Sequence, residues 1–275
     1  MSKYKIINIH GHLHQNDHLE QLVKIWKKDG VIKFCVLALG KQLAKHGYFT
    51  NRDVLKTMKE YPDIVVGMGH IELGPALDKV AKIEQLKEQG FSGLKFISPV
   101  APYSDERYFP YYEKAVKLNM PIVFHVGWMA ASEDDRQFGV NSEWMRPYTL
   151  DRVARSFPKL KIVLAHPGKP HGEEGLYLCT SFPNVYLCPS GAAGSDFYIA
   201  RLKKLLAPFP GADWNNPDEN CAKIFFRKFV FGTDNPPVSL WYSQAVKLMD
   251  YLHIEDKTRQ LFFWKNAADI FGWKF

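Results

Sequence analysis

Near the start of the chain stands the run Tyr4-Lys5-Ile6-Ile7-Asn8-Ile9-His10-Gly11-His12. It is an apolar stretch that ends in two histidines. Alternate residues of a β-strand point to the same side, so the imidazoles of His10 and His12 can bind one cation from the end of a strand. An isolated pair of this kind is more often two polar residues at the start of a loop. The positions of the other histidines decide between these two interpretations.

Three further metal-competent residues also follow short apolar runs. His125 ends the run 121–125, His166 ends the run 161–166, and Asp234 comes directly after 229–233. Chance does not usually place four such sites directly after apolar, β-branched or aromatic runs. We therefore expect these side chains to lie at strand ends and to form one site with the first pair.

Short apolar runs alternate with helical patterns along the chain. The eight expected strands cover residues 4–9, 31–39, 64–68, 93–97, 121–126, 161–165, 184–188 and 228–231. The expected helices cover residues 75–89, 105–118, 146–157 and 241–252, where apolar residues recur at helical spacing. This alternation predicts an α/β fold, a parallel (β/α)8 TIM barrel. A doubly wound sheet is the alternative, but it would normally carry a glycine-rich phosphate-binding turn after its first strand, which this chain lacks.

The composition fits a single domain over residues 1–275, since a barrel of this type takes about 250 residues. Hydrophobic residues make up 46% and charged residues 24% of the chain, an ordinary globular balance. No apolar run reaches the length of a membrane span, so we expect no membrane partner. The N-terminus lacks an apolar secretory signal and the cysteines form no CxxC pair, which indicates a cytoplasmic protein.

The net charge of +7 does not by itself indicate a nucleic-acid partner. The lysines are spread along the expected helices and mixed with acidic residues, as on solvated helix faces. We therefore expect a small-molecule substrate, with a mild preference for anions, and no nucleic acid. A homodimer is left open.

Active sites of such barrels form at the C-terminal ends of the strands. The last and first strands of a closed ring are neighbours, so Asp234 should lie near His10 and His12, with His125 and His166 across the mouth. Three imidazoles and one carboxylate suit a zinc ion, and Mn²⁺ or Fe²⁺ are alternatives. The ion would lower the pKa of a bound water to roughly 7. Asp234 would take its proton, and His166 would be a further ligand or would polarise a substrate carbonyl.

An ordered set of motifs resembles the amidohydrolase superfamily. The motifs are Ile7-Asn8-Ile9-His10-Gly11-His12, Gly93-Leu94-Lys95-Phe96, Phe124-His125-Val126-Gly127, Leu164-Ala165-His166-Pro167-Gly168, Asn184-Val185-Tyr186-Leu187, Phe231-Gly232-Thr233-Asp234-Asn235-Pro236 and Asn266-Ala267-Ala268-Asp269-Ile270-Phe271-Gly272-Trp273. The chain is most similar to the amidohydrolase-related (amidohydrolase 2) branch, which contains aminocarboxymuconate-semialdehyde decarboxylase. The resemblance covers nearly the whole chain.

The resemblance implies a ligand set for the metal. It makes His10, His12, His125 and Asp234 ligands, and His166 a catalytic residue or an additional ligand. The family usually has aspartate two residues before the first histidine, where this chain has Asn8. We expect altered hydrogen bonding around the site rather than loss of the site.

Five residues are candidates for binding the substrate. Some superfamily members bridge two metals with a carbamylated lysine on the fourth strand. A single metal is commoner in this branch, so we interpret Lys95 as a charged pocket residue or a structural one. His70 ends the third strand and lines the pocket or supports it structurally. The long segment after the fifth strand contains Trp128, Arg136 and Arg146, which could close over a substrate or bind its carboxylate.

Three hypotheses for the function follow. The first is a metal-dependent hydrolase that attacks an ester, lactone or amide of a small anionic molecule with metal-activated water. The second is a metal-dependent non-oxidative decarboxylase, which the same ligands would serve. The third is a non-catalytic barrel, and the replacement at Asn8 is its only support.

Overall fold

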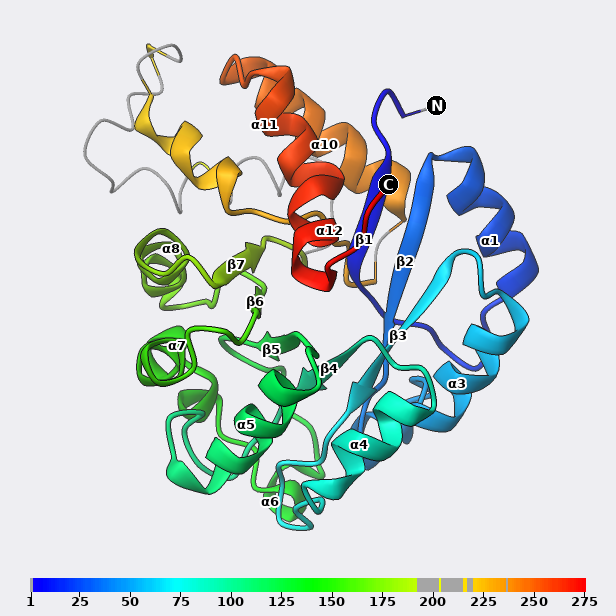
Figure 1. Cartoon of the computed structure of the whole chain (residues 1–275), viewed down its shortest axis with the longest axis vertical. Helices are drawn as coiled ribbons and strands as arrows, with labels where there is room; N and C mark the ends of the chain where they lie inside the picture. Colours follow the sequence, from blue (N-terminus) through cyan, green and yellow to red (C-terminus); the bar gives the residue numbers. More distant parts are fainter. Residues whose placement is uncertain (1, 192–202, 204–214, 217–219, 236) are drawn as a thin grey trace.

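The structure, a computed structural model, describes residues 2–191, 203, 215–216, 220–235 and 237–275. Seven parallel strands form one sheet in chain order, and Figure 1 shows them in a ring surrounded by helices. The strands are β1 Ile6–Gly11, β2 Val31–Leu37, β3 Val65–His70, β4 Gly93–Phe96, β5 Ile122–His125, β6 Ile162–Ala165 and β7 Val185–Cys188. The predicted α/β barrel is confirmed.

The expected eighth strand, residues 228–231, is an extended segment without regular strand pairing. The backbone N–H of Val230 donates to the carbonyl of Leu187 in β7 at 3.0 Å. On the other side, the N–H of Ile9 in β1 donates to the carbonyl of Phe231 at 2.9 Å. The segment therefore lies between the last and first strands and fills the gap in the ring.

A side chain explains why this segment is irregular. Asn266 donates through Nδ2 to the carbonyls of Arg227 and Phe229, at 3.0 and 2.8 Å. These backbone acceptors bond to an amide instead of joining a ladder between strands. The prediction of an eighth regular strand was wrong in this respect, although the segment occupies the expected place.

Helices follow most strands on the outside of the ring. The α-helices are α1 Leu19–Lys28, α2 Lys41–Ala44, α3 Asn51–Glu60, α4 Ala81–Glu88, α5 Phe109–Lys117, α6 Asp135–Phe138, α7 Asp151–Ser156, α8 Gly172–Ser181, α10 Val238–Tyr251, α11 Asp256–Gln260 and α12 Asn266–Phe271. The short 3₁₀ turns are η1 Glu106–Tyr108, η2 Ser142–Met145, η3 Pro147–Leu150 and η4 Cys221–Arg227, and η5 Leu261–Lys265 is a π-helical turn.

The helix expected over 75–89 is shorter than its pattern. Its first part is a turn, because the N–H of Asp78 donates to the carbonyl of Glu72 and the Asp78 carboxylate accepts from the Glu72 N–H. These local bonds compete with helix formation, so α4 begins only at Ala81.

Both faces of the strands are buried, as expected for a parallel sheet covered by helices. The inward side chains form a separate cluster inside the ring, which includes Ile9, Leu37, Met68, Val123 and Cys188. The outward side chains pack against the helices in a larger core. Two-sided burial explains why the strand segments read as nearly continuous apolar runs.

Helix α12 packs against the cluster inside the ring through Ala267, Ala268 and Ile270. Figure 1 is drawn with α12 in front of the strands. This helix covers the end of the barrel opposite the histidines. Asp269 of α12 pairs with Lys161, directly before β6, whereas His10 and His125 lie at the C-terminal ends of β1 and β5.

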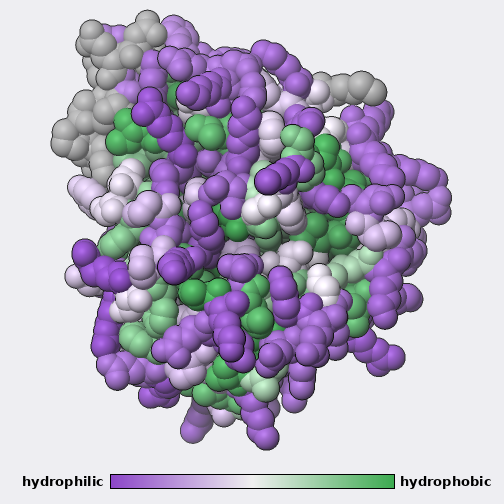
Figure 2. Space-filling view, viewed as in Figure 1, coloured by the Kyte–Doolittle hydropathy of each residue, from purple (hydrophilic) through white to green (hydrophobic). Residues whose placement is uncertain are grey.

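Hydrophilic side chains cover most of the face drawn in Figure 2, with smaller apolar areas between them. Such a surface suits the interpretation of the lysine-bearing helices as solvated. Among the described residues, no helix has the length and apolar character needed to cross a membrane.

Candidate metal centre

A β-bulge turns the two N-terminal histidines into the barrel. Asn8 pairs with Phe34 and Gly11 pairs with Val36. Between these two pairs β1 advances by three residues and β2 by two. The extra residue changes the alternation, and Ile9 and His10 both face inward. Gly11 faces outward onto the ring of Phe34, where an added Cβ would lie 2.3 Å from Cε1. Glycine is required there because the backbone passes so close to the aromatic ring.

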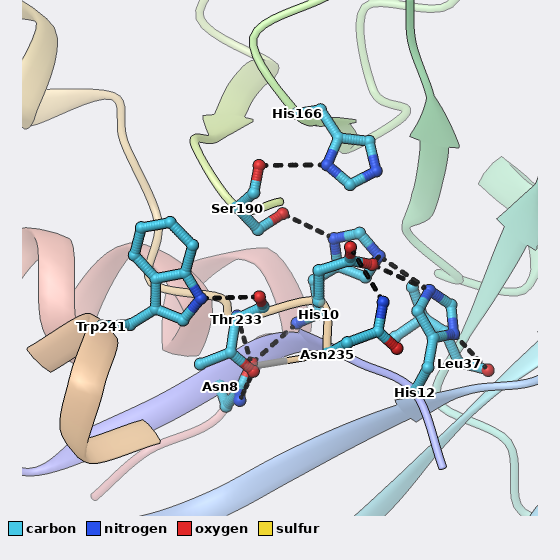
Figure 3. Close-up of polar contacts among 10 residues, drawn as sticks. Asn8, His10, His12, Leu37, His166, Ser190, Thr233, Asn235 and Trp241 are labelled. Atoms are coloured by element: carbon cyan, nitrogen blue, oxygen red, sulfur yellow. Dashed lines mark hydrogen bonds and ion pairs between the residues drawn. The ribbon is translucent and has the colours of Figure 1, made fainter. Parts of the chain in front are cut away.

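The amide of Asn8 holds this bulge. Its Oδ1 accepts from the backbone N–H of His10 at 3.1 Å and of Thr233 at 3.3 Å. Its Nδ2 donates to Oγ1 of Thr233 at 2.8 Å. These contacts, drawn in Figure 3, join β1 to the residue just before Asp234. The Asn8 amide thus makes three hydrogen bonds, which join the bulge to the turn before Asp234.

The ring nitrogens of His10 and His12 converge. The Nε2 atoms lie 3.0 Å apart, and each lies 3.4 Å from Oδ1 of Asp234. Asp234 has a left-handed backbone conformation, with φ of 67°, at the end of the segment beside β1. Two ligands placed 2.0–2.1 Å from a tetrahedral zinc ion lie about 3.3 Å from each other. The three residues therefore have the spacing of ligands to one ion, and their ligand atoms all lie within 4.8 Å of one another.

Hydrogen bonds from the opposite nitrogens orient both rings (Figure 3). Nδ1 of His12 donates to the carbonyl of Leu37 at 3.2 Å, so its Nε2 presents a lone pair. Nδ1 of His10 lies 2.8 Å from Oγ of Ser190. Bonds of this kind fix ring orientation and tautomer in metal sites.

His125 and His166 lie beside this group. The ring centroid of His166 is 5.1 Å from that of His10 and 4.8 Å from that of His125. Nδ1 of His166 lies 3.0 Å from the carbonyl oxygen of Ser190. Nε2 of His125 is buried and, within the described part of the chain, has no hydrogen-bond partner. A buried nitrogen without a partner is costly, and an ion would satisfy it.

Burial keeps these imidazoles neutral. It lowers the pKa of His10 and of His125 well below the usual value, with Lys95 and the neighbouring histidines acting in the same direction. Burial also lowers the pKa of His12 to about 4, although the Asp234 carboxylate opposes the shift. Neutral imidazole is the form that binds metals. These imidazoles are therefore in the protonation state that metal binding requires at neutral pH.

Lys95 is a buried cation next to the cluster. It is 1% exposed and sits on β4 at a position in register with the inward residue Val123 of β5. Burial lowers its pKa to about 8, while the Asp234 carboxylate opposes the shift. Its charge in turn lowers the pKa of His10 and His12. Lys95 thus places a buried positive charge beside the neutral imidazoles.

His70 lies in register with Lys95, at the end of β3, and is 4% exposed. Nε2 lies 3.7 Å from Oε2 of Glu72, beyond hydrogen-bond range, and neither ring nitrogen has a hydrogen bond to a described residue. The Asn51 side chain bonds to both backbone groups of His70, at 2.7 and 2.9 Å. An added Cβ on Gly40 would lie 2.5 Å from Nε2, so the ring lies directly against this loop.

In the described part of the chain, no side-chain hydrogen bond or ion pair joins the cluster of His10, His12 and Asp234 to the three candidates from the segment after β5. Trp128 is 66% exposed, and its backbone N–H donates to the carbonyl of Lys169. Arg136 is exposed on the short helix α6. Arg146 forms ion pairs with Glu174 and Glu143, which raise its pKa. A substrate carboxylate would have to compete with these glutamates for Arg146.

The sequence did not predict several residues that contact the histidines and Asp234. Ser190 is fully buried and contacts both His10 and His166, yet its only signal is its position just after the expected strand 184–188. Nδ2 of Asn235 donates to Oδ2 of Asp234 at 3.2 Å. The ring centroid of Tyr48 lies 5.8 Å from that of His12. No local pattern marks Tyr48, because its loop is distant in sequence.

Solved structures share this fold at low sequence identity. An uncharacterized TIM-barrel protein from Bordetella bronchiseptica is 19% identical, with 92% of this chain and 82% of that chain covered and a TM-score of 0.66. A probable 2-pyrone-4,6-dicarboxylic acid hydrolase from Acinetobacter baumannii, solved with citric acid, is 14% identical, with 98% and 100% covered and a TM-score of 0.63. A 5-carboxyvanillate decarboxylase from Novosphingobium aromaticivorans, solved with manganese and 4-hydroxy-3-methoxy-5-nitrobenzoic acid, is 17% identical, with 92% and 79% covered and a TM-score of 0.55.

No curated protein matches the sequence. The family model described as Amidohydrolase matches residues 37–273, which is most of the chain. The barrel and the cluster of histidines and aspartate agree with this match. The chain belongs to the amidohydrolase family.

Proposed function

We propose that this protein is a metal-dependent hydrolase acting on an ester, lactone or amide of a small anionic molecule. The observation that carries the proposal is the convergence of His10, His12 and Asp234 at the C-terminal mouth. We assign these three residues and His125 as ligands of one divalent ion, with zinc favoured by the three imidazoles and one carboxylate. Manganese is the alternative, since the similar 5-carboxyvanillate decarboxylase was solved with it.

A bound divalent ion supplies Lewis-acid activation of water and of the substrate carbonyl. The protein's own residues supply the rest. Oδ2 of Asp234, the carboxylate oxygen that faces Asn235, takes a proton from the attacking water and returns it to the leaving group. His166, whose ring lies beside those of His10 and His125, polarises the substrate carbonyl or completes the ligand set. The Lys95 ammonium binds an anionic group of the substrate, and His70 beside it contacts a second polar group.

Non-oxidative decarboxylation is the second candidate. It is supported by the buried charge of Lys95, which suits a substrate carboxylate, and by the fold shared with 5-carboxyvanillate decarboxylase. In that reaction a C–CO₂⁻ bond is replaced by a C–H bond. A non-catalytic barrel is disfavoured, because Asn8 forms hydrogen bonds that support His10 instead of disrupting the site.

The two reactions are separated by their products. The metal-loaded protein should be assayed with 2-pyrone-4,6-dicarboxylate, other small lactones and 5-carboxyvanillate. Hydrolysis consumes base in a pH-stat, while decarboxylation releases CO₂. We expect metal-dependent base consumption that is lost in His12→Ala. Release of CO₂ without hydrolysis would replace the first proposal with the second.

A further inference from the structure

We propose that Asn8 is a positioning residue for the metal centre, so that His10 and Asp234 reach their ligand positions only while its amide holds them. The inference rests on the metal site of the proposed function. Asn8 does not touch the space between the ligands. It acts through the backbone of His10 and through Thr233, and neither of these contacts could be read from the sequence.

The side chain of Asn8 points outward from β1. Before the bulge, Asn8 pairs with Phe34, an outward position, so its amide lies behind the ligands. The residue is nonetheless 0% exposed. A buried polar side chain is normally hydrogen-bonded. Asn8 is not one of the proposed ligands, so its three hydrogen bonds explain why a polar residue stands at this buried position.

The Asn8 amide satisfies polar groups on two segments of the chain. Oδ1 accepts from two backbone N–H groups, that of the nearby His10 and that of Thr233, which is 225 residues from Asn8. This assignment also fixes the amide orientation, because only the oxygen can accept. Nδ2 then donates to the Thr233 hydroxyl. One side chain therefore joins the bulge that carries His10 to the turn that carries Asp234.

Further hydrogen bonds support the turn that carries Asp234. Trp241 of α10 donates through Nε1 to the carbonyl of Thr233 at 2.8 Å, so the turn is held from the outer side as well (Figure 3). The N–H groups of Thr233 and Asp234 also donate to the carbonyl of His10, at 2.9 and 2.8 Å. Loss of the Asn8 amide would leave the turn attached but free to shift relative to the bulge.

The matched variants are Asn8→Leu, Asn8→Asp and Asn184→Leu. Leucine keeps the volume and removes all three bonds. Aspartate keeps both acceptor bonds, and the Thr233 hydroxyl can rotate to donate to it. Asn184 is the control, because it is also a buried amide in the barrel, and it bonds to the carbonyls of Phe157 and Leu160 away from the ligands.

The measurements are the dissociation constants of Zn²⁺ and Mn²⁺ by calorimetry and the absorption spectrum with Co²⁺ in place of the native ion. We expect Asn8→Leu to bind metal about 10- to 100-fold more weakly, the usual effect of removing a group that orients ligands. Its Co²⁺ spectrum should differ from that of the wild type. Asn8→Asp should restore both properties, and Asn184→Leu should lower the melting temperature without changing either.

Wild-type metal affinity and an unchanged Co²⁺ spectrum in a folded Asn8→Leu variant would overturn the inference and leave the metal site intact. A wild-type protein that binds neither ion would instead contradict the proposed function itself. If Asn8→Leu does not fold, Thr233→Val decides, since it removes only the acceptor of Nδ2. Weaker metal binding by that variant would support the positioning role, and unchanged binding would refute it.

Discussion

Nε2 of His10 and Nε2 of His12 lie 3.0 Å apart inside the mouth of the barrel. Because Nδ1 of His12 donates to a backbone carbonyl, its Nε2 presents a lone pair toward His10. Burial keeps both rings neutral, as their lowered pKa values show. A cation bound to both nitrogens and to Asp234 would satisfy this arrangement.

Asp234→Asn should largely abolish turnover while part of the metal is retained. An amide oxygen can replace one carboxylate oxygen as a ligand, but it cannot carry a proton in the working pH range. Loss of general acid–base catalysis typically costs on the order of 10²–10⁴-fold. The test is the turnover number measured beside metal content and melting temperature. Near-normal turnover with metal bound would remove Asp234 from the proton transfer and leave His166 as the candidate base.

The metal-free protein should lose stability as the pH falls from about 6.5 to about 4. The folded-state pKa of His12 is lowered to about 4 by burial, so the unfolded chain binds the extra proton first and is favoured in this window. Lowering the pKa of His12 from 6.5 to about 4 corresponds to about 3 kcal/mol for a fully buried group. Melting temperatures across this range should fall less steeply for His12→Gln than for the wild type. Equal slopes would show that His12 is not a buried neutral base.

Gly11→Ala should destabilise the fold by about 1–3 kcal/mol, the usual cost of an overpacked core. The new methyl group would lie 2.3 Å from the ring of Phe34, which stacks on Trp26. Urea unfolding measures the effect. The double variant Gly11→Ala/Phe34→Leu removes the obstructing ring, so its free energy of unfolding should fall by less than the sum of the two single changes. Strict additivity would contradict the predicted contact.

Lys95→Met should weaken binding of an anionic substrate and strengthen binding of the metal. The variant removes a buried positive charge that acts on His10 and His12. We expect KM for an anionic substrate to rise by about 10-fold or more, as for loss of a charged hydrogen bond. Lys114→Met is the surface control, because Lys114 pairs with Glu84 away from the mouth. An unchanged KM together with tighter metal binding would mean that the charge of Lys95 acts on the histidines and not on the substrate.

The sequence predicted the barrel and the convergence of His10, His12 and Asp234 because both depend on local patterns. Apolar runs mark the strands, and polar residues directly after them mark the strand ends. The bulge that turns His10 inward was not predictable, because it depends on contacts of Asn8 with Thr233, 225 residues away. The irregular pairing of the eighth segment likewise depends on the hydrogen bonds from Asn266 to the carbonyls of Arg227 and Phe229. No pattern within residues 228–231 reveals these bonds.

The candidate substrate-binding residues were harder to predict than the cluster of histidines and aspartate. Lys95 and His70 follow from strand register and lie at inward positions. Arg146 was a candidate because guanidinium groups suit carboxylates, but the structure pairs it with Glu174 and Glu143. Ser190 carries no signal besides its position after a strand. Residues in loops are set by long-range packing, which a single sequence does not encode in its local periodicity.

Metal stoichiometry tests the central claim most directly. Elemental analysis should compare the purified protein with His12→Ala, and His14→Ala is the control. His14 is a nearby histidine that lies outside the cluster and packs on Tyr48. We predict about one divalent ion per chain, zinc above manganese, in the wild type and the control, as in sites with this ligand set. His12→Ala should lose most of it. Equal and negligible metal in all three proteins, even after incubation with Zn²⁺ and Mn²⁺, would contradict the account.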